Sequence, residues 1–165
     1  MTAFECTSYD LGPISLQPIP AEDADKLGDA LAAIPPWSVI SYEGRQMANA
    51  LKREEPSVKQ FEVLAGTALA GVIVIQDPFM HGPYLKLLAV LPDFQGRRLG
   101  ESLLQWMESE ARKAKARQLW VCVSTFNTRA RAFYERFGFE AVATIDKLAT
   151  DSSDEIFMRK RLPQS

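Results

Sequence analysis

The chain has 165 residues, of which 47% are hydrophobic and 24% are charged, which is the composition of an ordinary globular protein with a core. This length predicts a single domain over residues 1–165. The formal net charge of -2 argues against a general nucleic-acid binder, because such proteins usually carry a basic surplus.

The cysteines and the histidine exclude several kinds of site. Two cysteines, Cys6 and Cys122, predict neither a disulfide framework nor zinc binding, and a single histidine, His81, excludes a histidine-based metal cluster. We therefore expect no metal and a reducing, cytoplasmic setting. The N-terminus lacks the regions of a signal peptide, and no apolar run approaches ~20 residues, so we expect no membrane partner.

The first half of the chain predicts two helices and three strands. In chain order these are a loosely packed segment at 1–12, a strand at 13–19, helices at 21–34 and about 42–52, and strands at 58–66 and 68–76. The first helix is indicated by Leu27, Leu31 and Ile34 at helical spacing, and Pro35 ends it. The last two strands form a hairpin near Gly66.

The second half predicts an alternation of strands and helices. The expected elements are strands at 84–91, 118–125, 140–148 and 155–162, and helices from Arg97 to about Lys115 and from 127 to 138. The strand–helix–strand segment from 85 to 124 predicts a parallel crossover, while the other neighbours pair antiparallel. The order therefore predicts an α/β fold with a mixed, mostly antiparallel central sheet of about seven strands and helices on both faces.

A run of glycine and arginine, QGRRLG at 95–100, opens the longest predicted helix. A helix N-terminus offers unpaired amides to an anion, glycine lets a ligand approach the backbone, and arginine binds phosphate oxygens. The run therefore indicates either a site for a phosphorylated ligand or a solvated helix start. It matches neither the P-loop nor the dinucleotide fingerprint.

A second motif, NTRARAFYERFGF, follows the strand at 118–125. Asn127 is a good helix N-cap whose side-chain amide can also reach a ligand. Phe133 and Phe137 are expected in the core, whereas Tyr134 lies at the edge of the same helical face, so its hydroxyl could reach a cleft. Taken alone, such a tyrosine is more often a half-buried aromatic than an acid.

Three segments together resemble the GNAT superfamily of acyl-CoA-dependent N-acetyltransferases, over about residues 14–162. LLAVLPDFQGRRLGESLL is similar to the strand, phosphate loop and helix of the family, NTRARAFYERFGFE to its N-x-x-A-x-x-x-Y-x-x-x-G-F pattern, and DEIFMRKRL to its terminal strand. The resemblance implies the acyl-CoA N-acyltransferase fold, whose sheet splays at a cofactor wedge. It also implies transfer of an acetyl group from acetyl-CoA directly to a primary amine of a small molecule or a protein.

The resemblance further implies the residues of a cofactor site. Backbone groups of Leu88, Ala89 and Val90 would pair with the pantetheine arm of acetyl-CoA, and Asn127 would contact this arm. The loop that would bind the pyrophosphate consists of Gln95, Gly96, Arg97, Arg98, Leu99 and Gly100.

Arg98 departs from the family pattern Q/R-x-x-G-x-G/A, because it stands at the middle glycine. An arginine would be costly there if the position required a positive φ. We therefore expect Arg98 to lie already in the right-handed helix, with its amide toward the pyrophosphate and its side chain outward. Whether the side chain also binds a phosphate stays open.

The resemblance implies some of the catalytic groups but leaves the general base open. The resemblance implies that Tyr134 protonates the leaving thiolate and that the Val90 N–H binds the oxyanion. The segment HGPYLKLL lacks the glutamate that several family members carry, which leaves as bases His81, Tyr84, Glu62 or an ordered water. Cys122 is more simply a small buried residue than a nucleophile.

The acceptor site is expected in the first half of the chain. Trp37 and Tyr42 could wall an amine pocket and Glu43 could pair with a cation, with ordinary loop packing as the alternative. The missing carboxylate and Arg98 keep a second function open, a non-catalytic module that binds acyl-CoA as a sensor or partner. The oligomeric state is also open, a homodimer included, and no nucleic acid is expected.

Overall fold

The computed structural model describes residues 2–164. The helices are α1 (Ala21–Ala32), α2 (Gly44–Lys52), α3 (Leu99–Lys113) and α4 (Thr128–Phe137), and the strands are β1 (Tyr9–Asp10), β2 (Ser15–Gln17), β3 (Val58–Ala65), β4 (Ala68–Gln76), β5 (Tyr84–Val90), β6 (Gln118–Ser124), β7 (Glu140–Thr150) and β8 (Ser153–Arg161). A short 3-10 turn covers Pro92–Phe94. All predicted helices and strands are present, with bounds that differ by a few residues.

The strands form one sheet in the order β1-β2-β3-β4-β5-β6-β8-β7, and every neighbouring pair is antiparallel except β5 and β6. The predicted fold class is therefore confirmed. The described part of the sheet has eight strands where about seven were predicted, because the two-residue strand β1 adds to the edge.

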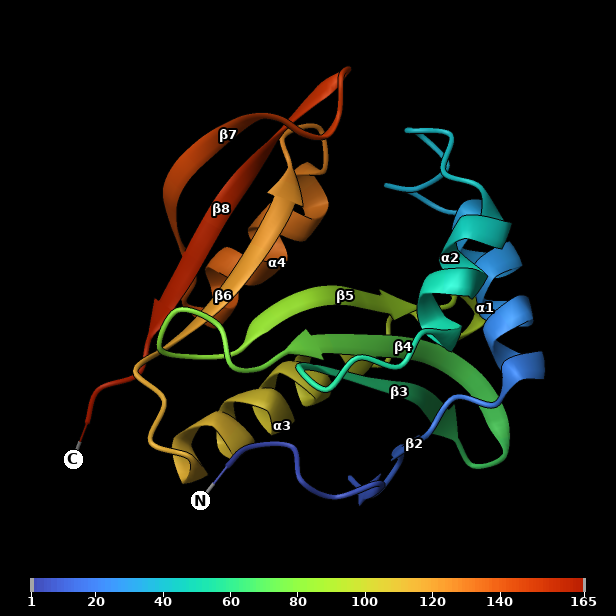
Figure 1. The fold of residues 1–165 in the computed structure, drawn as a ribbon, viewed down its shortest axis with the longest axis horizontal. Coiled ribbons are helices and arrows are strands. Elements are labelled where there is room, and N and C mark those ends of the chain that lie inside the picture. Colours follow the sequence, from blue (N-terminus) through green and yellow to red (C-terminus); the bar gives the residue numbers. More distant parts are fainter. Residues whose placement is uncertain (1, 165) are drawn as a thin grey trace.

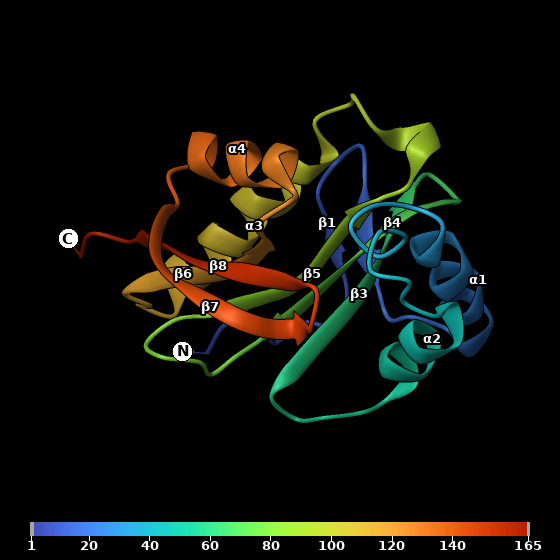
Figure 2. The ribbon, with the colours of Figure 1, turned by 90° about the horizontal axis from the view of Figure 1, so that it is seen from above.

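Helices cover both faces of the sheet (Figures 1 and 2). On one face, α1 and α2 bury Leu27, Leu31 and Met47 against Val72 of β4 and Ala89 of β5. On the other face, α3 and α4 lie together, and the larger core forms there around residues of α3, β5 and β6. The central strands are therefore buried on both sides, as their continuous apolar runs indicate.

The sheet opens between β5 and β6. These parallel strands pair only at Tyr84↔Trp120 and Leu85↔Val121. Beyond this point β6 and β8 turn away from β5, so the two halves of the sheet diverge in Figure 1. The end of β5, from Leu87 to Val90, consequently has no neighbouring strand on this edge among the described residues.

The N-terminal segment is better packed than expected. Phe4 is 1% exposed, and its ring centroid lies 5.3 Å from that of Trp106 on α3. Tyr9 packs edge-on against the same indole at 4.9 Å. Among residues 2–12, the prediction of loose packing is therefore wrong for Phe4 and Tyr9, because these aromatic side chains complete the core beneath α3.

Two carboxyl groups meet where α1 packs on the sheet. Glu62 of β3 is 4% exposed and is hydrogen-bonded to Asp23 of α1. Burial, followed by the hydrogen bond and charge of Asp23, raises the pKa of Glu62 to about 7, and the same hydrogen bond lowers the pKa of Asp23. Glu62 therefore holds a proton that stabilises the ionised Asp23.

This pair predicts a pH-dependent gain from the substitution Glu62→Gln. The folded pKa of Glu62, about 7, lies above the unfolded value of about 4.3, so wild-type protein loses stability as the pH rises between these values. The neutral amide removes this loss. Thermal denaturation should show a higher Tm for the variant at pH 8 and a much smaller gain at pH 5.

The matched control is Glu22→Gln, which neutralises an exposed carboxylate in the first turn of the same helix. It should show no gain that grows with pH. A Glu62→Gln protein with the Tm of wild type at pH 8 would contradict the shared proton.

Candidate functional site

A cleft of about 760 Å³ opens beside the unpaired end of β5. Its walls come from β5, the loop after it, the N-terminal ends of α3 and α4, and the loop between α1 and α2. The sequence-predicted site residues that line it are Leu88, Ala89, Val90, Gln95, Gly96, Arg98, Leu99, Gly100, Asn127 and Tyr134. Arg97 is the one residue of the predicted cofactor site outside this lining.

Backbone groups of β5 face this opening. The N–H of Leu91 donates to Ala70 O at 2.8 Å, on the β4 side. Because successive residues of a strand direct their backbone groups to opposite edges, those of Val90 and Leu88 point toward the opening. Gln95 Nε2 donates to Val90 O at 3.0 Å, which fits this direction. The backbone of Ala89 therefore faces β4, and only its side chain lines the cleft.

Arg98 is the N-cap of α3, with φ 60° and ψ 26°. The prediction that Arg98 lies in the right-handed helix is therefore wrong, and α3 begins one residue later, at Leu99. A left-handed backbone costs a residue other than glycine roughly 1–2 kcal/mol, which explains why glycine suits this position. No side chain caps the helix, so the first N–H groups of α3 are left for a partner in the cleft.

Two glycines of the loop serve different purposes. Gly96 has φ 80°, and no heavy atom lies within 4 Å of the place a Cβ would take, so this position stays open to a ligand. Gly100 has its open side filled, because a Cβ there would lie 3.1 Å from the Phe133 ring of α4. Gly100 thus allows α4 to approach the first turn of α3.

The cleft carries more positive than negative charge. Arg98, Arg129 and Arg136 line it together with one carboxylate, Glu101. Arg97 is turned aside, with its guanidinium carbon 5.2 Å from the centre of the Phe94 ring. An open helix N-terminus with nearby arginines is a suitable place for a phosphate group.

The N-terminus of α4 forms the opposite wall. Asn127 is its N-cap, and Oδ1 accepts a hydrogen bond from the Ala130 N–H at 3.2 Å, which leaves the amide nitrogen free to donate. Tyr134, one helical turn after Ala130, is 7% exposed and packs against Phe139. Burial raises the pKa of the Tyr134 hydroxyl above its ordinary value, so this group keeps its proton at neutral pH.

The loop between α1 and α2 closes the cleft from the other face of the sheet. Its lining residues are Ile34, Pro35, Pro36 and Trp37. Tyr42 and Glu43, which the sequence also suggested for an acceptor, lie outside the lining. Glu43 instead caps α2 in a reciprocal arrangement with Gln46, so its role is structural.

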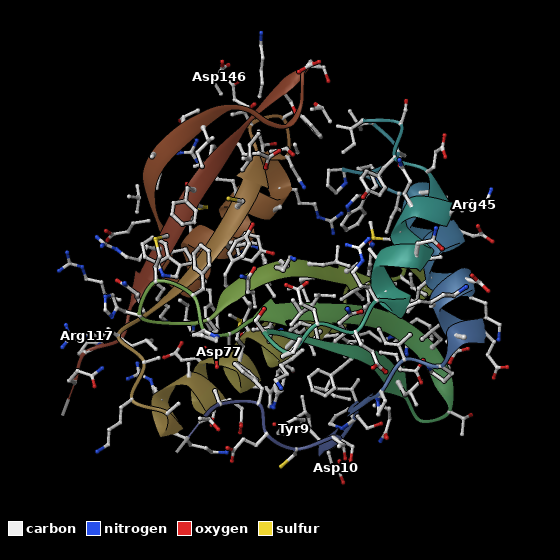
Figure 3. All side chains as sticks on the ribbon, viewed as in Figure 1. Tyr9, Asp10, Arg45, Asp77, Arg117 and Asp146 are labelled. Carbon is white, nitrogen blue, oxygen red and sulfur yellow. The ribbon has the colours of Figure 1, made fainter. Side chains whose placement is uncertain are left out.

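None of the three side-chain base candidates lines the cleft, and Tyr84 of β5 stacks on Phe79 instead. His81 lines a separate hollow with Asp77 and Arg117, which lie on the side of the molecule opposite Arg45 of α2 (Figure 3). Glu62 is buried with Asp23 beneath α1. Neither side chain belongs to the lining of the cleft.

One polar group near the opening was missed by sequence reasoning. Glu155 of β8 is 6% exposed and accepts a hydrogen bond from Ser124 Oγ at 2.7 Å. Alternation along DEIFMRKR offered a signal, because it places Glu155 on one face with Phe157 while Ile156 and Met158 face the core.

Residues 2–164 are the part of the chain that the structure describes. This part of the chain contains no group of three or more His, Cys, Asp or Glu residues that could hold a metal ion. None of its helices is both long and apolar enough to cross a membrane.

Comparison with known proteins gives a sequence relative and several structural neighbours. The ribosomal protein bS18-alanine N-acetyltransferase of Escherichia coli is 29% identical over 104 residues, which is 63% of this chain and 64% of that protein, less than two thirds of its length. The structure of an acetyltransferase from Thermus thermophilus matches with a TM-score of 0.72 and 21% identity, over 93% of this chain and 100% of that one. PaiA N-acetyltransferase from Thermoplasma acidophilum, in complex with coenzyme A, matches with a TM-score of 0.65 and 21% identity, over 90% and 99%.

The structural neighbours show that the fold is shared. The family is shown by a sequence comparison with a family model. The model of the acetyltransferase (GNAT) family matches residues 25–139, which contain the end of β5, the glycine–arginine loop and the α4 motif. The chain belongs to the acetyltransferase (GNAT) family.

Proposed function

We propose that this protein is an N-acetyltransferase that moves an acetyl group from acetyl-CoA directly to a primary amine. The observation that carries this proposal is the unpaired edge of β5 beside the uncapped N-terminus of α3. An extended ligand with a phosphate group at one end complements both features, and the pantetheine arm and pyrophosphate of acetyl-CoA have this form.

The cofactor would extend along the cleft. The backbone of Leu88 and Val90 would pair with the pantetheine arm, while the Ala89 side chain and the free amide nitrogen of Asn127 would contact it. The pyrophosphate would bind to the amides of the loop and the first turn of α3, from Gln95 through Gly96, Arg98 and Leu99 to Gly100. Arg97 would contribute its amide, because its guanidinium lies against Phe94.

The reacting thioester would lie between β5 and α4. The N–H of Val90 points toward the opening and would stabilise the oxyanion of the tetrahedral intermediate. The Tyr134 hydroxyl, which keeps its proton, would donate it to the leaving thiolate. Both groups line the same cleft, which supports their action on one substrate.

The acceptor amine would enter from the side of the α1–α2 loop. Trp37 and the neighbouring prolines form that wall, so we propose an apolar contact next to the amine. The Escherichia coli relative is named for acetylation of an alanine of a ribosomal protein, which supports a protein amine as well as a small molecule.

The activity is tested by release of free thiol from acetyl-CoA with three amines: a peptide with a free N-terminal alanine, an N-blocked peptide with one lysine, and a polyamine. We expect turnover with at least one of them. Binding of acetyl-CoA without turnover on any amine would instead favour a non-catalytic acyl-CoA-binding module.

The role of Tyr134 predicts a selective loss in Tyr134→Phe. Loss of a general acid should lower kcat on the order of 100-fold, while the dissociation constant of acetyl-CoA, measured by calorimetry, stays within about twofold. The control Tyr42→Phe removes an exposed hydroxyl outside the cleft and should leave both quantities unchanged. Normal turnover by Tyr134→Phe would remove this residue from the mechanism.

The left-handed backbone of Arg98 allows a comparison of two variants. Arg98→Gly relieves the strain and should raise stability by about 1 kcal/mol, which for a chain of this size is roughly 2–4 °C in Tm. We expect it to keep measurable acetyl-CoA binding, because the backbone amides remain in place.

Arg98→Ala removes the same side chain but keeps the strained backbone, so it should not gain stability. If both variants lose affinity for acetyl-CoA equally, the guanidinium itself binds phosphate. If only Arg98→Ala loses affinity, the contribution of this residue lies in its backbone. A complete loss of binding in Arg98→Gly would contradict the proposed role.

A further inference from the structure

An attacking amine must lose protons, and the one carboxylate that lines the cleft, Glu101, stands in the first turn of α3 rather than at the β5 edge. We propose that Glu155 of β8 is the general base that accepts the proton of the acceptor amine. This inference rests on the proposed acetyltransferase function and adds to it the residue that activates the acceptor.

The register of the sheet places Glu155 one strand beyond the opening, on β8 next to β6 and outside the lining of the cleft. Glu155 pairs with Ser124, the last residue of β6, and with Ile145 on β7. The pairing of β6 with β5 ends at Val121, so Ser124 and Glu155 lie beyond the point where the two strands separate. The side chain therefore stands on the far side of the opening from β5, where β8 runs beside β6 in Figure 1.

Strand alternation decides which face of the sheet Glu155 occupies. Val121 and Val123 belong to the core that α3 and α4 cover, so Ser124 and its partner Glu155 point to the other face. This is the face on which α1 and α2 lie and from which Trp37 reaches the cleft. Tyr134 approaches from the α4 side. The base and the acid would thus stand on opposite sides of the reacting centre.

The surroundings of Glu155 suit a proton acceptor. Ser124 Oγ donates to Oε1 and fixes the carboxylate, and no other side chain among residues 2–164 donates to it, so Oε2 is left to take a proton. Burial raises the pKa of Glu155, and the Ser124 hydrogen bond opposes this rise. The Glu155 carboxylate is therefore more basic than an exposed one.

The other groups around Glu155 come from four elements, β5, β6, β7 and α4. Cys122 on β6 and Tyr84 on β5 both have raised pKa values, first through burial and also through the charge of Glu155. Ile145 on β7 is apolar, and Tyr134 on α4 is near enough to Tyr84 to add to the rise of its pKa. No cation among these neighbours stands ready to neutralise Glu155, which leaves the ammonium group of the acceptor as its counterion.

The step balances with the groups at hand. Glu155 takes one proton from the bound ammonium, and the freed lone pair forms the C–N bond to the thioester carbonyl. The C–S bond then breaks, its electrons leave on sulfur, and Tyr134 protonates this thiolate. The second proton of the nitrogen restores the Tyr134 hydroxyl, and Glu155 releases its proton to solvent. The net reaction converts an ammonium and acetyl-CoA into an amide, free coenzyme A and one proton.

The test compares Glu155→Gln with wild type over pH 6 to 9, using thiol release with the amine that wild type accepts. In wild type, kcat/KM should rise with pH and level off once Glu155 is ionised, below the pKa of the free amine, because Glu155 deprotonates the bound ammonium. In Glu155→Gln it should fall about 100-fold at pH 7 and continue to rise toward the pKa of the free amine, since only neutral amine reacts. The dissociation constant of acetyl-CoA should not change.

Two further variants separate a catalytic role from a structural one. Ser124→Ala removes the hydrogen bond that lowers the pKa of Glu155, so the acidic limb of the profile should move to higher pH. The control Asp151→Asn neutralises an exposed carboxylate in the turn between β7 and β8 and should behave as wild type.

The remaining outcomes each decide the matter. A Glu155→Gln protein within threefold of wild type, with the same pH profile, overturns the inference and leaves the proposed function intact. A joint loss of activity and acetyl-CoA binding, with a lower Tm, overturns it in favour of a structural role. Absence of turnover by wild type on every amine overturns the proposed function, and the role of Glu155 with it.

Discussion

The separation of β5 from β6 after two paired residues is the constraint on which the rest of the structure depends. Backbone N–H and C=O groups that lose a strand partner must find another one, and here the end of β5 is left facing a cleft. The glycine–arginine loop and the uncapped start of α3 follow directly in the chain, so a second set of unpaired amides stands beside the first. The unpaired end of β5 and the uncapped start of α3 therefore lie side by side, and together they define a binding site.

The same separation makes the cleft accessible from both faces of the sheet. The α3 and α4 side supplies the loop, Asn127 and Tyr134, whereas the α1 and α2 side supplies Trp37 and, in our proposal, Glu155. In our proposal, acetyl-CoA and the acceptor amine would approach a common point from different faces of the sheet. The positive charge of the cleft comes from Arg98 at the start of α3 and from Arg129 and Arg136 of α4, while the buried carboxylate of Glu155 lies on the opposite face of the sheet.

Much of this could be predicted from the sequence, because periodic patterns and short motifs are local. The helices and strands follow from patterns in contiguous segments, and the lining residues from Leu88 to Tyr134 were implied by the resemblance of two short motifs to the GNAT family. The backbone of Arg98 could not be predicted, since its left-handed conformation depends on how the loop enters α3. The packing of Phe4 on Trp106 and the bond between Ser124 and Glu155 were also out of reach, because each joins residues far apart in the chain through tertiary packing.

The contact of Gly100 with Phe133 has a consequence for the dimensions of the site. The ring lies 3.1 Å from the place that a Cβ of Gly100 would take, so the lack of a side chain at Gly100 lets the start of α3 come this near to α4. Gly100 belongs to the loop of the proposed phosphate site, and Phe133 is the neighbour of Tyr134. The contact between Gly100 and Phe133 therefore sets the distance between the two ends of the cleft. In the proposed function this distance selects the length of the ligand. Only an arm of matching length would bring its thioester to Tyr134 while its phosphates bind to the loop.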